Sequence, residues 1–257
     1  METTRESVLE LKKKQVTIKV KRYRPTKDSE PYFQEYKIPL KSDMVVLDAL
    51  NYIKDNIDGS LTYRWSCRMG VCGSCGSNVN GKPKLTCETF IDDLGDTLTV
   101  EPMARFPIIK DLVVDIDSFM AKLKDVKPWI ISETEKPLKE GENLQTPEQV
   151  DLYKQQSMCI NCMLCYSACP VVGTEDDFIG PAALALAYRY NMDSRDQGEK
   201  ERLKITSSEE GVYGCSWIGE CTSVCPKNVD PAIAIQKLKL TGSLQSIKEL
   251  LLPKFVK

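Results

Sequence analysis

Cysteine is the residue type in this sequence with the clearest capacity for chemistry, and its densest run, C-I-N-C-M-L-C-Y-S-A-C-P, spans residues 159–170. The spacing Cys-x₂-Cys-x₂-Cys-x₃-Cys-Pro is the one that binds iron–sulfur clusters in bacterial ferredoxins. Cys159, Cys162 and Cys165 lie on one loop and can bind three corners of a 4Fe–4S cluster. Cys169 lies beyond that loop, and in such motifs the fourth cysteine binds a second cluster. The run therefore predicts a partner motif.

That partner motif is C-x₅-C-x₃-C-P at residues 215–226. Aligned with the first run, it carries Ile218 in place of its second cysteine. Cys225 then completes the 4Fe–4S cluster. Three cysteines are left for the other cluster: Cys169, Cys215 and Cys221. Three thiolates suit a 3Fe–4S cluster, whose missing corner needs no ligand. A zinc site or unrelated buried thiols would leave the two matching Cys-Pro endings unexplained.

The N-terminal cysteines follow a different spacing, C-x₄-C-x₂-C-x₁₁-C over residues 67–87. It begins with the plant-type 2Fe–2S spacing, in which the fourth ligand comes from a later strand. The predicted ligands are Cys67, Cys72, Cys75 and Cys87. Gly70, Gly73 and Gly76 let the backbone approach closely and direct N–H groups at the sulfides, although each could be an ordinary turn residue. The three ligand sets use all eleven cysteines.

Composition also points to sulfur chemistry. Histidine is absent, which excludes Rieske clusters, histidine-ligated haem, Cys/His zinc fingers and Ser–His or Cys–His catalysis. Residues 1–14 are polar and unlike a signal peptide, so metal-bound thiolates in a reducing compartment are favoured over disulfides. With a net charge of −2, no nucleic-acid partner is expected. No apolar run approaches ~18 residues, so the chain is not expected to cross a membrane.

The length of 257 residues suggests two domains. The predicted strands and helices described next make this an α+β protein. The first domain, residues 1–107, is predicted to be a β-grasp sheet of the plant-type 2Fe–2S ferredoxin kind. Its elements are strands at 15–23, 32–40 and 97–100, a helix capped at Ser42-Asp43, and a hairpin turn at Asn80-Gly81.

The second domain, residues 108–257, is predicted to be all-helical, like bacterial ferredoxin motifs set among helices. Apolar spacing predicts a helix over 108–124, and a polar connector follows at 132–146. Further helices are predicted from a T-P-E-Q capping box at 146–149, from Gly180, from Asp230-Pro231 to Leu240, and from Ser243 to before Pro253.

Clusters of three types imply a relay that moves single electrons and does no bond chemistry of its own. A two-electron donor releases a pair of electrons, which must be passed to these clusters one at a time. A flavin on another subunit is the usual means. The chain lacks a Gly-x-Gly-x-x-Gly fingerprint, so it is not expected to bind a dinucleotide in that way.

Over nearly its whole length the chain resembles the iron–sulfur subunit of fumarate reductases and succinate dehydrogenases. The matching segments are R-W-S-C-R-M-G-V-C-G-S-C-G at 64–76, R-D-Q-G at 195–198 and C-P-K-N-V-D-P at 225–231. The resemblance implies a FAD-bearing subunit that interconverts fumarate and succinate, and membrane-anchor subunits near which a quinone binds. Electrons would pass between the two through the 2Fe–2S, 4Fe–4S and 3Fe–4S clusters. The chain would lie peripherally on the cytoplasmic face of the inner (cell) membrane.

Two positions place the chain closer to the fumarate-reductase branch. Succinate dehydrogenases commonly carry histidine after the first cysteine of the second motif and tryptophan shortly after the first Cys-Pro. This chain has Ser216 and V-V-G at 171–173 in those places. It thus resembles the menaquinone-type quinol:fumarate reductases of anaerobic respiration. The alternative is a succinate dehydrogenase of the tricarboxylic acid cycle, working in the succinate-oxidising direction.

The resemblance also implies that Lys239 contacts the quinone, because it matches a lysine that contacts quinol in such fumarate reductases. Without the resemblance, Lys239 would be taken for a solvated helix lysine. Trp217 either lines the quinone pocket or packs under the cluster. Four apolar residues either dock a membrane anchor or face the core: Leu244, Ile247, Leu250 and Leu251.

Two other classes of function are disfavoured. In a hydro-lyase, a three-cysteine 4Fe–4S cluster leaves one iron open as a Lewis acid, but this chain lacks histidine, a substrate domain and a spare acid–base pair. A free soluble ferredoxin needs no dedicated partner, but 257 residues is oversized for one.

Overall fold

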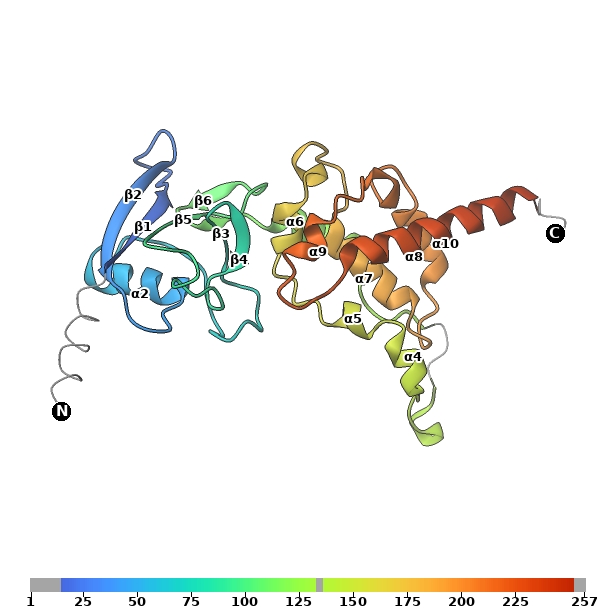
Figure 1. Ribbon diagram of the computed structural model, residues 1–257. Helices are drawn as coiled ribbons and strands as arrows, with labels where there is room; N and C mark the ends of the chain where they lie inside the picture. The colour runs from blue at the N-terminus through green and yellow to red at the C-terminus, as the bar shows by residue number, and fades with distance from the viewer. Residues whose placement is uncertain (1–14, 133–135, 252–257) are drawn as a thin grey trace. The chain divides into compact units, whose positions relative to one another are not determined.

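The computed structural model describes residues 15–132 and 136–251, which divide into two compact units (Figure 1). Unit 1 comprises the chain up to residue 115 together with residues 162–167, and unit 2 comprises residues 116–161 and the chain from 168 onward. In the described ranges, no helix is both long and apolar enough to span a bilayer. The boundary expected between residues 107 and 108 stays a prediction.

Unit 1 is built on a five-stranded sheet with the order β2-β1-β5-β3-β4. Its strands are β1 (Gln15–Arg22), β2 (Tyr32–Pro39), β3 (Gly76–Val79), β4 (Lys82–Leu85) and β5 (Thr97–Glu101). β1 pairs antiparallel with β2 and parallel with β5, so that Ile18 lies opposite both Tyr36 and Leu98. All three side chains are buried, and helix α2 (Val46–Asn56) packs its apolar side into the same core. The β-grasp prediction is confirmed.

The hairpin turn predicted at Asn80-Gly81 joins β3 to β4. Both residues have positive φ, 48° and 77°, as a two-residue Asn-Gly hairpin loop requires. The chain leaves β4 two residues before Cys87, so this turn fixes where the last cysteine of the N-terminal set returns to the sheet.

The predicted cap of helix α2 is wrong. The Ser42 hydroxyl donates to the Asp43 carboxylate (2.9 Å) rather than accepting a bond from the helix. The first helical N–H group, on Val46, donates instead to the carbonyl of Thr89 (2.9 Å). The helix start is thus satisfied by the segment that follows Cys87, which is distant in sequence and left no local signal.

The helix predicted over residues 108–124 is wrong in its first half, which forms a two-stranded hairpin. The elements are β6 (Ile108–Lys110), β7 (Val113–Val114) and α3 (Asp117–Asp125). At the turn, Asp111 has a φ of 47° and a buried carboxylate that accepts hydrogen bonds from Arg22 Nε (2.9 Å) and the N–H of Thr62 (2.9 Å). Distant partners therefore fix this turn, and apolar spacing alone could not reveal it.

Unit 2 is helical, as predicted. Besides α3 its elements are η1 (Leu138–Glu140), α4 (Pro147–Asp151), α5 (Lys154–Ser157), η2 (Val171–Gly173), α7 (Pro181–Asn191), α8 (Glu199–Thr206), η3 (Val212–Gly214), α9 (Glu220–Ser223) and α10 (Pro231–Leu251). Helices α7 and α10 pack against each other (Figure 1). Their buried alanines, among them Ala183, Ala187 and Ala234, keep the contact surfaces small enough for close approach.

Three of the predicted helix starts in unit 2 are confirmed. Thr146 and Gln149 form a reciprocal capping box, with N–H to side-chain distances of 2.9 and 3.3 Å. Helix α7 follows Gly180, and the Asp230 carboxylate accepts the N–H of Ile233 (3.0 Å) at the start of α10.

The separate last helix predicted from Ser243 is wrong, because α10 continues unbroken to Leu251. The preceding Gly242 looks like a helix break in the sequence, but a Cβ at that position would lie 2.3 Å from the Ser207 Oγ. Glycine is therefore present for close packing within the helix rather than to end it.

Helix α6 (Leu164–Ala168) lies within the first cysteine run, and its residues up to 167 group with unit 1. The Tyr166 ring lies 5.1 Å from the Phe106 ring. A Cβ added to Gly76, at the start of β3, would lie 3.2 Å from Leu164 Cδ2. A segment from the middle of the sequence thus completes the packing of the N-terminal unit.

Candidate iron–sulfur sites

The loop of residues 67–75 directs backbone N–H groups at cysteine sulfur. Cys67 Sγ accepts from the N–H groups of Met69 (3.5 Å), Val71 (3.3 Å) and Cys72 (3.3 Å). Gly70 and Gly73 have φ values of 64° and 73°, a left-handed conformation that glycine adopts without strain. Convergent N–H groups of this kind stabilise the negative charge of an iron–sulfur centre.

The N-terminal cysteines lie within electrostatic reach of one another, and their pKa values shift in opposite directions. Hydrogen bonds from the Cys67 N–H and from Ser74 lower the pKa of Cys72 to about 6. Burial raises the pKa of Cys87 to about 12, with further contributions from Cys75 and Cys67. A bound metal deprotonates its thiol ligands outright. The donor-lined loop and the buried thiol opposite it therefore fit a 2Fe–2S cluster.

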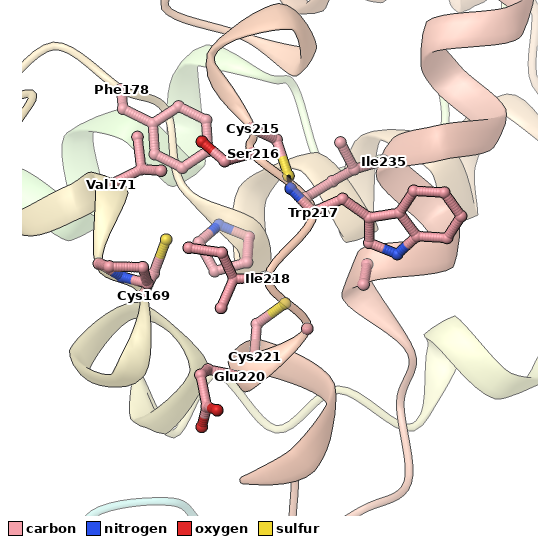
Figure 2. A pocket seen from close by; sticks show the side chains of 14 residues that line it. Cys169, Val171, Phe178, Cys215, Ser216, Trp217, Ile218, Glu220, Cys221 and Ile235 are labelled. Carbon is pink, nitrogen blue, oxygen red and sulfur yellow. Dashed lines mark hydrogen bonds between the residues drawn. The ribbon is translucent and has the colours of Figure 1, made fainter.

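In unit 2, three cysteines from separate segments line one recess. Cys169 follows α6, Cys215 follows η3 and Cys221 lies in α9, and all three border the same hollow as Ile218. Figure 2 shows Ile218 surrounded by the three cysteines. Ile218 therefore lies in the same recess as the three cysteines, and its replacement of a fourth ligand stays a prediction.

Most of the residues that line the recess are apolar, although Ser216 and Glu220 border it too. Val171, Phe178 and Ile235 line it, and burial raises the pKa of Cys221 to about 11, with Cys169 and Cys215 contributing through their charge. Burial therefore opposes ionisation of the Cys221 thiol, and a bound metal, which deprotonates its thiol ligands, would overcome that cost. The donor set fits a cluster with three thiolate ligands.

The remaining cysteines are Cys159, Cys162, Cys165 and Cys225. Burial raises the pKa of Cys159, and the charge of Cys225 contributes to the same shift. Gln155 Nε2 donates to the carbonyl of Asn228 (2.9 Å), which ties α5 to the loop after Cys225. Unit 2 thus brings Cys159 and Cys225 together, while Cys162 and Cys165 lie in the segment that groups with unit 1.

None of the eleven cysteines is joined to another by a disulfide bond. Among the described residues, no group of three or more His, Cys, Asp or Glu side chains is arranged to hold a single metal ion. The pKa shifts of Cys87, Cys159 and Cys221 nevertheless each include a charge contribution from another cysteine of the same predicted set.

Lys239 is not a freely solvated lysine. Its Nζ donates to the carbonyl of Cys215 (2.8 Å), and its side chain is half-buried. Trp217 has a φ of 52°, and its backbone N–H donates to Cys215 Sγ (3.4 Å). The residue is 60% exposed. Trp217 therefore borders the recess from the outside rather than packing under it (Figure 2).

The four apolar residues at the end of α10 do not face the core. Leu244, Ile247, Leu250 and Leu251 are between 50% and 79% exposed. Leu240, one turn earlier, is 63% exposed. Together they form an uncovered apolar stripe on this helix.

Two supporting residues gave no signal in the sequence. One is Gln155, described above. The other is Lys122 of α3, whose Nζ donates to the carbonyls of Asp176 and Phe178, the latter at 2.9 Å. Burial lowers the pKa of Lys122. Because Phe178 lines the recess, this lysine fixes one of its walls.

Two sequence families match the chain. The family described as a 2Fe-2S iron-sulfur cluster binding domain matches residues 17–121, and the family described as a 4Fe-4S dicluster domain matches residues 155–229. Both cysteine systems thus lie within recognised iron–sulfur domains.

Curated relatives align over most of the chain. The fumarate reductase iron-sulfur subunit of Mycobacterium tuberculosis is 55% identical, covering 93% of this chain and 97% of its own. That of Escherichia coli O6:H1 is 50% identical, covering 93% and 96%. The succinate dehydrogenase iron-sulfur subunit of Coxiella burnetii is 40% identical, covering 87% and 95%.

A solved structure has the same fold. A chain of the Mycobacterium smegmatis Sdh1 complex in the apo form superposes with a TM-score of 0.83 at 26% identity, covering 91% of this chain and 97% of its own.

Proposed function

The chain belongs to the iron–sulfur subunits of fumarate reductases and succinate dehydrogenases, and from that premise we propose that it is the electron relay of a membrane-bound quinol:fumarate reductase. It carries single electrons between a quinone and the FAD of a partner flavoprotein that interconverts fumarate and succinate. The observation that carries the proposal is the recess in which three cysteines surround Ile218. Three thiolates suit a 3Fe–4S centre, which would differ from the 4Fe–4S centre of the relay.

Each ligand set has its own cofactor in this proposal. The 2Fe–2S cluster takes Cys67, Cys72, Cys75 and Cys87. The 4Fe–4S cluster takes Cys159, Cys162, Cys165 and Cys225. The 3Fe–4S cluster takes Cys169, Cys215 and Cys221. When bound, such clusters supply one-electron carriers whose potentials depend on cluster type, charge, hydrogen bonding and exposure.

The chain's own residues then set the environment of each carrier. N–H groups around Cys67 oppose the charge that reduction adds. Phe178 and Ile235 give the recess apolar walls. Lys239 holds the Cys215 carbonyl and places a positive charge beside the recess, where it can also meet a quinone. Trp217 borders the same opening.

Two exposed apolar surfaces support the proposed protein partners. Near the 2Fe–2S loop, Trp65, Met69 and Val71 are 42%, 67% and 56% exposed, which suits a flavoprotein that receives electrons there. The stripe on α10 suits a membrane-anchor subunit. Binding to an anchor would hold the chain peripherally at the cytoplasmic face of the membrane.

The direction of physiological turnover rests on Ser216 and the V-V-G segment at 171–173, which favour the menaquinol-linked fumarate reductase. The identity of 50–55% to fumarate reductase iron-sulfur subunits supports the same direction. The alternative is a succinate dehydrogenase that oxidises succinate and reduces a quinone.

The test is to purify the native complex and measure both directions with the same preparation. We expect quinol-driven fumarate reduction to exceed quinone-linked succinate oxidation. We also expect electron paramagnetic resonance (EPR) to detect three distinct centres, one of them a 3Fe–4S centre in the oxidised state. Faster succinate oxidation would establish the alternative, and the absence of a 3Fe–4S signal would refute the relay as assigned.

A further inference from the structure

Glu88, the residue after Cys87, has its carboxylate packed against the 2Fe–2S loop. A Cβ added to Gly70 would lie 1.7 Å from Glu88 Oε1 and 2.4 Å from Oε2. The carboxylate therefore occupies the space that a side chain at position 70 would fill. Gly70 also has a left-handed φ of 64°, which favours glycine at this position.

Gly70 also faces the proposed ligands directly. Its N–H group interacts with the Cys87 thiol and lowers the pKa of that thiol, against the larger effect of burial. Gly70 lies between Cys67 and Cys72, the first two cysteines of the loop. The Glu88 carboxylate is thus separated from the proposed ligands by little more than one glycine.

The negative charge of the Glu88 carboxylate affects how readily the proposed 2Fe–2S cluster accepts an electron. One-electron reduction adds negative charge to an iron–sulfur centre, and nearby charge and hydrogen bonds set its potential. The loop N–H groups make reduction easier, whereas the Glu88 carboxylate packed against the loop makes it harder. Glu88 is exposed, so salt will screen part of its effect.

We propose that Glu88 tunes the 2Fe–2S centre by lowering its reduction potential, opposing the N–H groups of the loop. The inference rests on the proposed function, because it takes residues 67–87 to hold that cluster. Glu88 acts through its charge on the loop and is not itself a ligand.

The experiment is a redox titration of the 2Fe–2S EPR signal in the native complex. Glu88→Gln removes the charge at nearly constant shape, Glu88→Ala removes the side chain, and Glu88→Asp retains the charge. Glu35→Gln is the matched control, because Glu35 lies on β2 and pairs with Lys19 (2.8 Å). We expect both neutral variants to shift the reduction equilibrium toward the reduced centre by at least threefold, where tenfold corresponds to ~59 mV. Glu88→Asp and Glu35→Gln should stay within twofold of the unsubstituted protein.

The outcomes separate the inference from the function on which it rests. Neutral variants that shift less than threefold, or in the opposite direction, overturn the tuning role while leaving the relay intact. Loss of the 2Fe–2S signal in both neutral variants, with Glu88→Asp unaffected, also overturns it and assigns Glu88 a structural role. Absence of any 2Fe–2S signal in the unsubstituted complex overturns the proposed function itself.

Discussion

The 2Fe–2S loop at residues 67–75 and the recess around Ile218 handle the charge of cysteine sulfur in different ways. In the loop, backbone N–H groups surround Cys67, and the pKa of Cys72 falls to about 6. In the recess, apolar side chains dominate, and the pKa of Cys221 rises to about 11. Several backbone N–H groups therefore prepare the loop for negative charge. In the recess, burial outweighs the hydrogen bond that the Thr222 backbone gives Cys221, and the Trp217 backbone N–H donates to Cys215.

The largest effect expected is the loss of one whole centre. Cys87→Ser should abolish the 2Fe–2S signal and leave the 3Fe–4S signal intact, because Cys87 belongs to unit 1 and the recess belongs to unit 2. EPR after partial reduction distinguishes the two centres. Loss of the 3Fe–4S signal with an intact 2Fe–2S signal would show that the ligand sets have been assigned wrongly.

A change of cluster type is the next effect in size. Ile218→Cys adds a thiolate among the three cysteines of the recess, and we expect a fourth iron to bind there. The oxidised-state 3Fe–4S signal should disappear and the iron content should rise by one atom per chain. Ile233→Cys is the control, because residue 233 lies on α10 outside the recess lining and should change neither value.

If the 3Fe–4S signal persists at full strength in a folded Ile218→Cys protein, position 218 does not face the vacant corner. The alignment of the second cysteine motif with the first would then be wrong.

Lys239→Ala should reduce quinol-linked turnover by about tenfold or more while sparing reaction with dyes that bypass the quinone. The lysine supplies the positive charge at the recess and a hydrogen bond to the Cys215 carbonyl, and bonds to charged groups contribute about 1.5–3 kcal/mol. Lys237→Ala is the matched control on the same helix, where the ammonium lies over the Tyr188 ring. Equal losses in the quinol and dye assays would instead assign Lys239 to folding or assembly.

The smallest effect expected is a change in the stability of unit 2, at a site away from the cysteines. Burial opposes ionisation of Asp193, but hydrogen bonds and charge from Arg195 and Arg189 lower its pKa to about 2. A folded pKa below the unfolded value of ~3.9 stabilises the protein above pH ~4, and this contribution is lost as the pH falls toward 2. Asp193→Asn should therefore lower the unfolding free energy by about 2 kcal/mol at pH 7 and less at pH 3.

Urea unfolding followed by circular dichroism measures this difference. Asp151→Asn is the control, since its carboxylate is 70% exposed and lies 4.0 Å from Lys154. A variant that loses equal stability at both pH values would exclude ionisation of Asp193 as the cause.

Local patterns in the sequence predicted the features that neighbouring residues determine. The Asn80-Gly81 turn, the Thr146 capping box and the β-grasp strands each depend on a few adjacent residues. Cysteine spacing likewise indicated which iron–sulfur domains the chain contains, because cluster geometry limits the separation of ligands on one loop.

The sequence failed where distant residues decide the structure. The first N–H group of helix α2 donates to the Thr89 carbonyl, and Arg22 donates to the Asp111 carboxylate at its turn. Both partners are distant in sequence, so neither feature has a local signal. The bond from Lys239 to Cys215 spans 24 positions and appears only after folding. The ligand role of each cysteine and the contacts of the quinone stay predictions.

The return of residues 162–167 to unit 1 has a consequence for biosynthesis. Phe106 and Gly76 emerge from the ribosome well before Tyr166 and Leu164, the residues that pack against them. Domains generally fold in order from the N-terminus during synthesis. Here the first unit stays incomplete until the first cysteine run has been translated. Truncations that end near residue 121 would therefore leave it with an exposed gap and a tendency to aggregate.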